Sequence, residues 1–232
     1  IFGQEAMGSG NIGASERNTG IGFAVMRSIT TGDSNVAVGA DTLFNITEGS
    51  ENVALGRDAG LDLNSGSESV LIGSRAGYNL TTTNGNVVIG RYALYNSNSA
   101  VDCIVIGRQA MMSGSATQTG TVAIGKNSLT NLSSGVGNTA IGFEALKGHT
   151  TGARNTVVGY EAMDGTGGAT VLDSNDNTFM GYNAGGGTWT TAVCQYNVGI
   201  GNYSLDGAMN GANLNTAVGY GSLGAVTSGS NN

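Results

Sequence analysis

The sequence contains no proline, and only 11 % of its residues are Asp, Glu, Lys or Arg. Aromatic residues make up 6 %, and there are two cysteines and one histidine. Because proline is absent beside 41 glycines, the chain is not a collagen, which needs both residues in a strict triplet period. A disordered tail is also excluded, because branched apolar residues recur at regular places.

The scarcity of basic and metal-ligating residues excludes further classes. A net charge of −7 argues against a nucleic-acid partner, since phosphate binding needs a basic face. No apolar run approaches the roughly 18 residues of a membrane span, so no membrane insertion is expected. Cys103, Cys194 and His149 occur without metal-site or disulfide spacing, and nucleotide-binding glycine motifs are absent. We therefore expect no cofactor, no metal and no catalytic residue.

The chain repeats one short phrase along its whole length. The phrase NTAIGFEAL, at residues 138–146, returns as NTVVGYEAM at 155 and as NTAVGYGSL at 215. A glycine that follows a bulky apolar residue anchors each copy, and seven of the twelve spacings between anchors are 17 residues. Such a period predicts an all-β fold, a parallel β-roll or β-solenoid of about 13 coils forming one repeat domain over residues 1–232. The anchors are Gly3, Gly22, Gly39, Gly56, Gly73, Gly90, Gly107, Gly125, Gly142, Gly159, Gly181, Gly201 and Gly219.

The residues before each anchor alternate in size. The residue directly before it is large and apolar, as at Ile141, and the residue two places earlier is β-branched, as at Thr139. The residue between them is small in many copies, as at Ala140. This pattern predicts a short strand that is buried on both faces. We expect the column of Ile141 to fill the interior of the coil and the column of Ala140 to pack against a neighbouring copy.

Two further columns predict how the coils stack and turn. Asn stands four places before the anchor in nine of the twelve copies that have this place, Asn138 and Asn155 among them. Stacked coils would align these side chains into an amide ladder. The anchor glycine marks a tight corner that needs positive φ or a close backbone approach. Residues such as Ala145 and Leu146 would then form a second short strand or a turn, followed by a polar outer loop.

The small apolar column gives a reason to expect a homotrimer. A monomeric solenoid with this pattern would expose an apolar stripe larger than soluble monomers tolerate. Three rolls, side by side or intertwined about a common axis, would cover it.

The phrase N-T-A-[IV]-G-x-x-A-[LM] resembles the left-handed parallel β-roll of YadA-like heads in trimeric autotransporter adhesins. It resembles the tandem repeats of phage tail fibres more closely, and the repeat is longer than that of bacterial heads. The resemblance implies a segment of a longer virion fibre, a parallel homotrimer with other fibre segments as partners, and a cell-surface glycan or protein as receptor. The alternative is an adhesin head at the bacterial surface, which binds host or matrix surfaces.

The positions after the anchors carry the residues most suited to recognition. Directly after the anchor come Arg57, Arg91, Arg108 and Lys126 in the middle coils and aromatic residues later, and a carboxylate follows in several coils. Aromatic rings supply flat apolar contacts, so these columns predict a receptor-binding surface together with two enlarged loops, TGGATVLDSNDN at 166–177 and GGTWTTAVCQYN at 186–197. The other interpretation is a solvated rim of weak ion pairs. The candidates are Phe143, Glu144, Tyr160, Glu161, Tyr182, Trp189 and Tyr220.

Glu144 and Glu161 also allow a third interpretation. They occupy the same column of consecutive coils, so their backbones should lie about 4.8 Å apart. Retaining glycosidases need two carboxylates at about 5 Å, and this leaves a polysaccharide-degrading tailspike as an alternative. Adjacent coils produce such pairs automatically, however, and the sequence signals no cleft.

Overall fold

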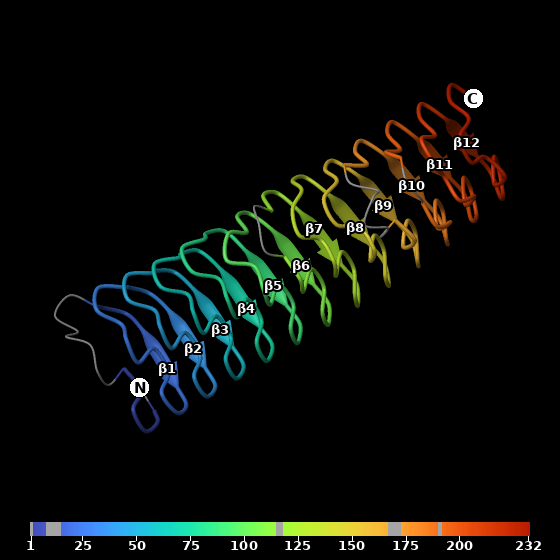
Figure 1. Cartoon of the computed structure of the whole chain (residues 1–232). Helices are drawn as coiled ribbons and strands as arrows, with labels where there is room; N and C mark the ends of the chain where they lie inside the picture. The colour runs from blue at the N-terminus through green and yellow to red at the C-terminus, as the bar shows by residue number, and fades with distance from the viewer. Residues whose placement is uncertain (1, 8–14, 115–117, 167–172, 190–191) are drawn as a thin grey trace. The chain divides into compact units, whose positions relative to one another are not determined.

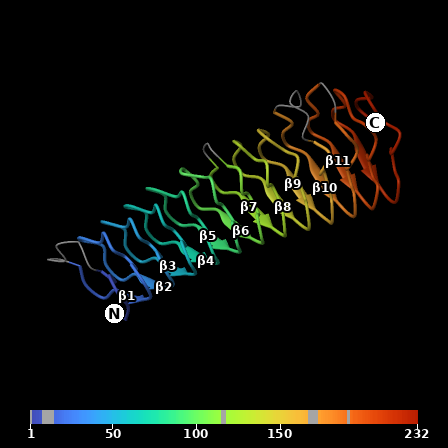
Figure 2. The same ribbon diagram turned by 60° about the horizontal axis from the view of Figure 1, so that its bottom comes forward.

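The computed structural model describes residues 2–7, 15–114, 118–166, 173–189 and 192–232. The chain divides into two compact units, Ile1–Thr119 and Gly120–Asn232. In each unit the backbone winds into stacked coils, and every coil contributes one short strand to a parallel sheet (Figures 1 and 2). The part of the chain that the structure describes contains no helix, so none could cross a membrane. The predicted all-β parallel solenoid is confirmed.

The strands are three residues long and pair in parallel, in chain order, within each unit. Each residue faces its equivalent in the next repeat, as Val36 faces Val53. At the first anchor, Phe2 forms an isolated parallel bridge with Ile21. The strands of the first unit are β1 (Thr19–Ile21), β2 (Val36–Val38), β3 (Val53–Leu55), β4 (Val70–Ile72), β5 (Val87–Ile89) and β6 (Ile104–Ile106). Those of the second are β7 (Val122–Ile124), β8 (Thr139–Ile141), β9 (Thr156–Val158), β10 (Thr178–Met180), β11 (Val198–Ile200) and β12 (Thr216–Val218).

The anchor glycines form the corner after each strand, and both predicted reasons for glycine hold. Their φ angles lie between 121° and 149°, a region that L side chains rarely adopt. A Cβ at Gly142 would also lie 2.1 Å from the carbonyl oxygen of Gly159, the next anchor in the stack. No side chain fits there, because the backbones of successive corners touch.

The segment after the anchor is a turn built on left-handed backbone, and no second strand forms there. Glu144 and Leu146 have φ angles of 57° and 51°, and Arg154, just before the ladder position, has 56°. Such angles are costly for non-glycine residues. They are held by hydrogen bonds to both neighbouring coils: the Glu144 N–H donates to the Lys126 carbonyl and the Leu146 N–H to the Ala162 carbonyl, both at 3.0 Å.

The core contains the small column, so the predicted orientation of the strands was wrong. Ala140, in the middle of β8, is completely buried, whereas Ile141 is 36 % exposed and points outward. The interior is closed by the residues three and four places after the anchor, such as Ala145 and Leu146, which are also fully buried. These turn residues fill the narrow coil and leave room for only a small residue from most strands. The predicted alternation of large and small residues is present, but the small residues face the core and the large ones face outward.

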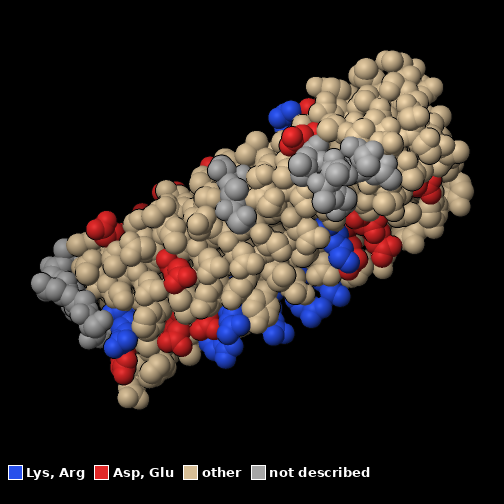
Figure 3. Space-filling view, in the orientation of Figure 1, with Lys and Arg blue, Asp and Glu red and all other residues tan. Residues whose placement is uncertain are grey.

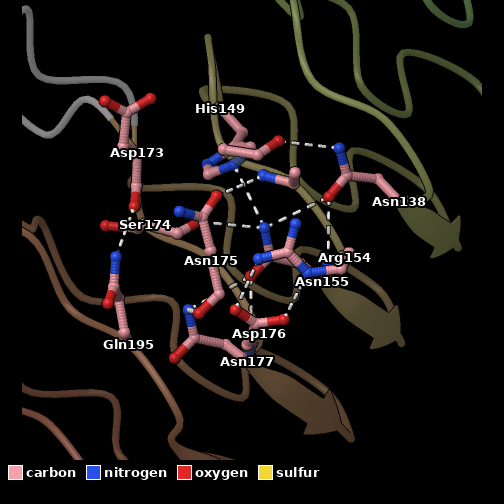
Figure 4. Close-up of polar contacts among 12 residues, drawn as sticks. Asn138, His149, Arg154, Asn155, Asp173, Ser174, Asn175, Asp176, Asn177 and Gln195 are labelled. Atoms are coloured by element: carbon pink, nitrogen blue, oxygen red, sulfur yellow. Dashed lines mark hydrogen bonds and ion pairs between the residues drawn. The ribbon is translucent and has the colours of Figure 1, made fainter.

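The predicted amide ladder is present and buried. Asn155 Nδ2 donates to Asn138 Oδ1 at 3.1 Å and to the Ser174 carbonyl at 2.9 Å, and Asn155 Oδ1 accepts from Asn177 (Figure 4). Asn155 thus joins three successive coils. Satisfied in this way, the buried amides stabilise the stack, and each becomes costly to remove. The ladder positions are Asn18, Asn35, Asn52, Ser69, Asn86 and Cys103 in the first unit and Asn138, Asn155, Asn177, Asn197, Asn215 and Asn232 in the second.

His149 occupies a core position that the sequence pattern placed in a polar loop. It stands seven residues after its anchor, the place of Leu132 in the preceding coil, and it is fully buried. Its Nε2 lies 3.3 Å from Asn155 Nδ2, and its Nδ1 has no hydrogen-bond partner among the described residues (Figure 4). Burial lowers the pKa of the imidazole to about 4, although the Gly152 backbone and the charge of Asp173 oppose the shift. His149 is therefore neutral in the folded protein near pH 7.

Replacing Asn155 by Ala should lower the free energy of unfolding by about 2–4 kcal/mol, because the Ser174 carbonyl, Asn138 Oδ1 and the Asn177 N–H would lose a partner. Asn131→Ala is the matched control: this Asn is exposed and should change stability by less than about 0.5 kcal/mol. Urea unfolding at one protein concentration measures both. Equal stabilities of the two variants would refute a stabilising ladder.

Acid should destabilise the protein in part through His149. The unfolded imidazole takes up its proton near pH 6.5, whereas the folded one does so only near pH 4. The free energy of unfolding should therefore fall as the pH drops from about 6.5 to 4, by about 3 kcal/mol from this residue. His149→Leu should lack this component, so its stability relative to the wild type should increase across that window. A constant difference between the two proteins in urea titrations from pH 7 to 4 would contradict the assignment.

Candidate functional site

The position directly after the anchor projects its side chain from the corner of each coil. In the second unit these positions bring aromatic rings of successive coils into contact. Phe143 and Tyr160 stack at 4.8 Å between ring centroids, and Tyr160 and Tyr182 stack at 5.6 Å. The row continues through edge contacts to Tyr203 and Tyr220. We call this set the aromatic ladder: Phe143, Tyr160, Tyr182, Tyr203 and Tyr220.

Four members of the aromatic ladder were predicted from the repeat, and Tyr203 was missed. Tyr203 stands two places after its anchor, so it falls outside the column of residues directly after the anchors. The signal was nonetheless in the sequence, because neighbouring columns of adjacent coils lie within reach of an aromatic ring. Tyr160 is 48 % exposed and Tyr182 40 %, so the ladder is open to contact from outside. Lys126 closes one end, with its Nζ 5.1 Å from the Phe143 ring centroid.

Glu144 and Glu161 line the aromatic ladder, and Glu144 is already engaged. Lys147 Nζ donates to Glu144 Oε2 at 2.8 Å, and Asn127 Nδ2 donates to Glu144 Oε1 at 2.9 Å. The Lys147 hydrogen bond is the main cause that lowers the pKa of Glu144, so this carboxylate is ionised at neutral pH. A glycosidase acid needs a raised pKa, and Glu144 departs from that requirement. The described part of the chain contains no pocket.

Trp189 does not lie on a surface, and its prediction as a recognition residue was wrong. It is fully buried, its Nε1 donates to the Gly185 carbonyl at 3.0 Å, and its ring meets Phe179 edge to face. Phe179 is the middle residue of β10, and it is larger than the residue at this position in the other strands. Gly185 and Gly199 make room for it, since a Cβ on either would lie within 2.8 Å of the Phe179 ring. Trp189, in the second enlarged loop, therefore packs in the core.

Potential metal ligands are dispersed among the residues that the structure describes. Within those residues, no three His, Cys, Asp or Glu side chains gather to hold a metal ion. Cys103 and Cys194 are both buried, and burial raises the pKa of the Cys194 thiol. Residues 167–172 of the first enlarged loop and 190–191 of the second lie outside the described residues.

Comparisons with protein-family models, with curated proteins and with solved structures found no match.

Proposed function

We propose that the protein is a structural shaft segment of a fibre that assembles as a parallel homotrimer, of the phage tail-fibre type. The observation that supports the trimer is the outward face of the strands. The first and third residues of every strand form an outer stripe. This stripe contains only Val, Ile, Leu, Met and Thr, and no charged residue. Its most exposed members include Ile21, Val36, Leu55 and Ile104 in the first unit and Ile141, Met180, Ile200 and Val218 in the second.

The outer stripe has the character of an interface. Every coil adds two apolar or Thr side chains, so the apolar face grows with the stack and remains in water in a monomer. A parallel trimer would bring equivalent strands of three chains to the same level around one axis. Each level would then bury like residues against like, and the interface would be mostly apolar, as in obligate oligomers. The strands therefore still present an apolar stripe that a trimer would cover. The stripe consists of the large residues of the strands and not of the small ones.

The proposed role of the shaft is mechanical. Coils joined by continuous hydrogen bonding have few free backbone groups, and a threefold interface would tie three such stacks together. The shaft would space a recognition region from its base and resist proteolysis, because opening one coil breaks bonds to two others. The length of the repeat favours a tail fibre, located in the virion, over the head of a bacterial adhesin at the cell surface. A polysaccharide-degrading tailspike is less supported, since Glu144 is held as an ion pair.

The aromatic ladder adds a second element to the proposal, the presentation of receptor contacts. Exposed stacked rings offer flat apolar surfaces to sugar rings or to a protein partner. The ladder lies beside Glu144 and Glu161, which can accept hydrogen bonds from hydroxyl groups. The receptor would be a cell-surface glycan or protein.

The trimer can be tested with two valine substitutions of equal chemistry. Sedimentation equilibrium of the wild type should give three times the chain mass of 23.2 kDa. Val36, in the outer stripe, is 36 % exposed, and Val136, outside the strands, is 40 % exposed. Val36→Asp would place three carboxylates together in the interface, at several kcal/mol each, and should dissociate the trimer. Val136→Asp should leave it intact. A wild-type monomer at micromolar concentration, or equal dissociation by both variants, would sink the proposal.

The receptor role of the aromatic ladder can be tested on cells. Tyr160→Ala should abolish adsorption of the labelled trimer to bacterial strains that bind the wild type, with an unchanged sedimentation mass. Tyr196→Ala is the control, because Tyr196 is similarly exposed, at 53 %, but lies outside the ladder. Undiminished adsorption of the Tyr160 variant would remove the ladder from the receptor-binding surface.

A further inference from the structure

A second set of side chains projects from the same corners in the first unit, and these are basic. The two positions after the anchors Gly56, Gly73, Gly90 and Gly107 contain four arginines and one carboxylate. We call the four the arginine row: Arg57, Arg75, Arg91 and Arg108. Many of the Lys and Arg side chains lie along the lower edge of the surface in Figure 3, with Asp and Glu side chains among them. This concentration contrasts with the net charge of −7 of the whole chain.

Asp58, the one carboxylate among these positions, is already paired. Its Oδ2 lies 3.4 Å from Arg57 Nε and 3.1 Å from Arg75 Nε, and its side chain is only 13 % exposed. Among the residues that the structure describes, no ion pair involves Arg91 or Arg108, and both are exposed. Asp58 therefore balances one of the four charges, and the arginine row keeps a net positive charge.

Tyrosine side chains hold two of the guanidinium groups in place. Arg75 Nη1 donates to Tyr92 Oη at 2.9 Å, and the Arg91 guanidinium carbon lies 4.8 Å from the Tyr92 ring centroid. A hydrogen bond from Arg91 is the main cause that lowers the pKa of the Tyr92 phenol. Tyr95 supports Tyr92 edge to face at 5.2 Å. Ordered in this way, the arginines lose less side-chain entropy when an anion binds.

The repeat sets the spacing of the charges. Arg91 and Arg108 stand in the same column of consecutive coils, and Arg57 stands two coils before Arg91. At a rise of about 4.8 Å per coil, the backbones of Arg91 and Arg108 are roughly 5 Å apart, and those of Arg57 and Arg91 roughly 10 Å apart. An extended polymer that carries a carboxylate, sulfate or phosphate on every sugar or every second sugar matches this row. A compact anion would meet only one or two of the arginines.

We propose that the arginine row binds an anionic polysaccharide that runs along the stacked coils. The inference names a ligand class for a fibre that presents receptor contacts, so it rests on that part of the proposed function. A single-stranded nucleic acid fits less well, because bases need free aromatic faces to stack on. Tyr92 instead has guanidinium groups and Tyr95 around its ring.

The test uses fluorescence anisotropy with end-labelled dextran sulfate, polygalacturonate, uncharged dextran and poly(dT), at two salt concentrations. The wild-type protein should bind dextran sulfate and polygalacturonate more tightly at low salt and should not bind uncharged dextran. Arg91→Gln and Arg108→Gln should each weaken binding roughly three- to tenfold and flatten the salt dependence, since each removes one ionic contact. The double variant should lose roughly thirtyfold or more if both arginines contact one chain.

Arg17→Gln is the matched control. Arg17 is exposed, forms no ion pair among the described residues and stands just before a ladder Asn, at another part of the coil. Its substitution should change the affinity by less than about twofold, because a remote charge is largely screened. An equal loss with Arg17→Gln, or equally tight binding of poly(dT), would overturn the proposal.

Sedimentation of the same samples separates this inference from the proposed fibre. A trimer that binds neither acidic polysaccharide would overturn the polysaccharide site and leave the shaft proposal standing. A monomer that binds them with the expected losses for Arg91→Gln and Arg108→Gln would support the site and overturn the trimer.

Discussion

Hydrogen bonds between successive coils are the interactions on which the rest of this structure depends. A coil of about 17 residues with a three-residue strand cannot enclose a core of its own, so its backbone donors and acceptors pair with the coils before and after it. This requirement explains the corner glycines, whose backbones touch, and the left-handed residues of the turn. It also explains the buried amide ladder, which supplies partners for backbone groups where the loop returns to the strand.

The same constraint decides where chemical variety is possible. Inside the coil, substitutions are compensated locally: Phe179 is accommodated by Gly185 and Gly199 and covered by Trp189. The outer stripe keeps one apolar character in both units, in agreement with a shared interface. The corners after the anchors vary more in chemistry. Four arginines occur there in the first unit and five aromatic residues in the second, so one backbone geometry offers two surfaces of different chemistry.

Stacking also amplifies the chemistry of each column. A single exposed arginine or tyrosine would be a weak contact, but a parallel register repeats it at a fixed interval along the stack. Neighbours then order one another, as Phe143 and Tyr160 do by stacking and Arg75 and Tyr92 by a hydrogen bond. A row of ordered side chains suits an extended partner better than a small ligand, and the described residues contain no pocket.

The sequence alone determined the period, the parallel strands, the glycine corners and the amide ladder, because a regular spacing fixes which residues meet in successive coils. Only the tertiary structure decided which face of the strand is inside. An alternating pattern is the same whichever face is buried, and the outcome depends on whether turn residues such as Leu146 leave room for Ile141 or for Ala140. The burial of His149 and Trp189 has the same origin. Each lies in a segment whose letters predict a loop, and the volume left by the surrounding coils brings its side chain into the core.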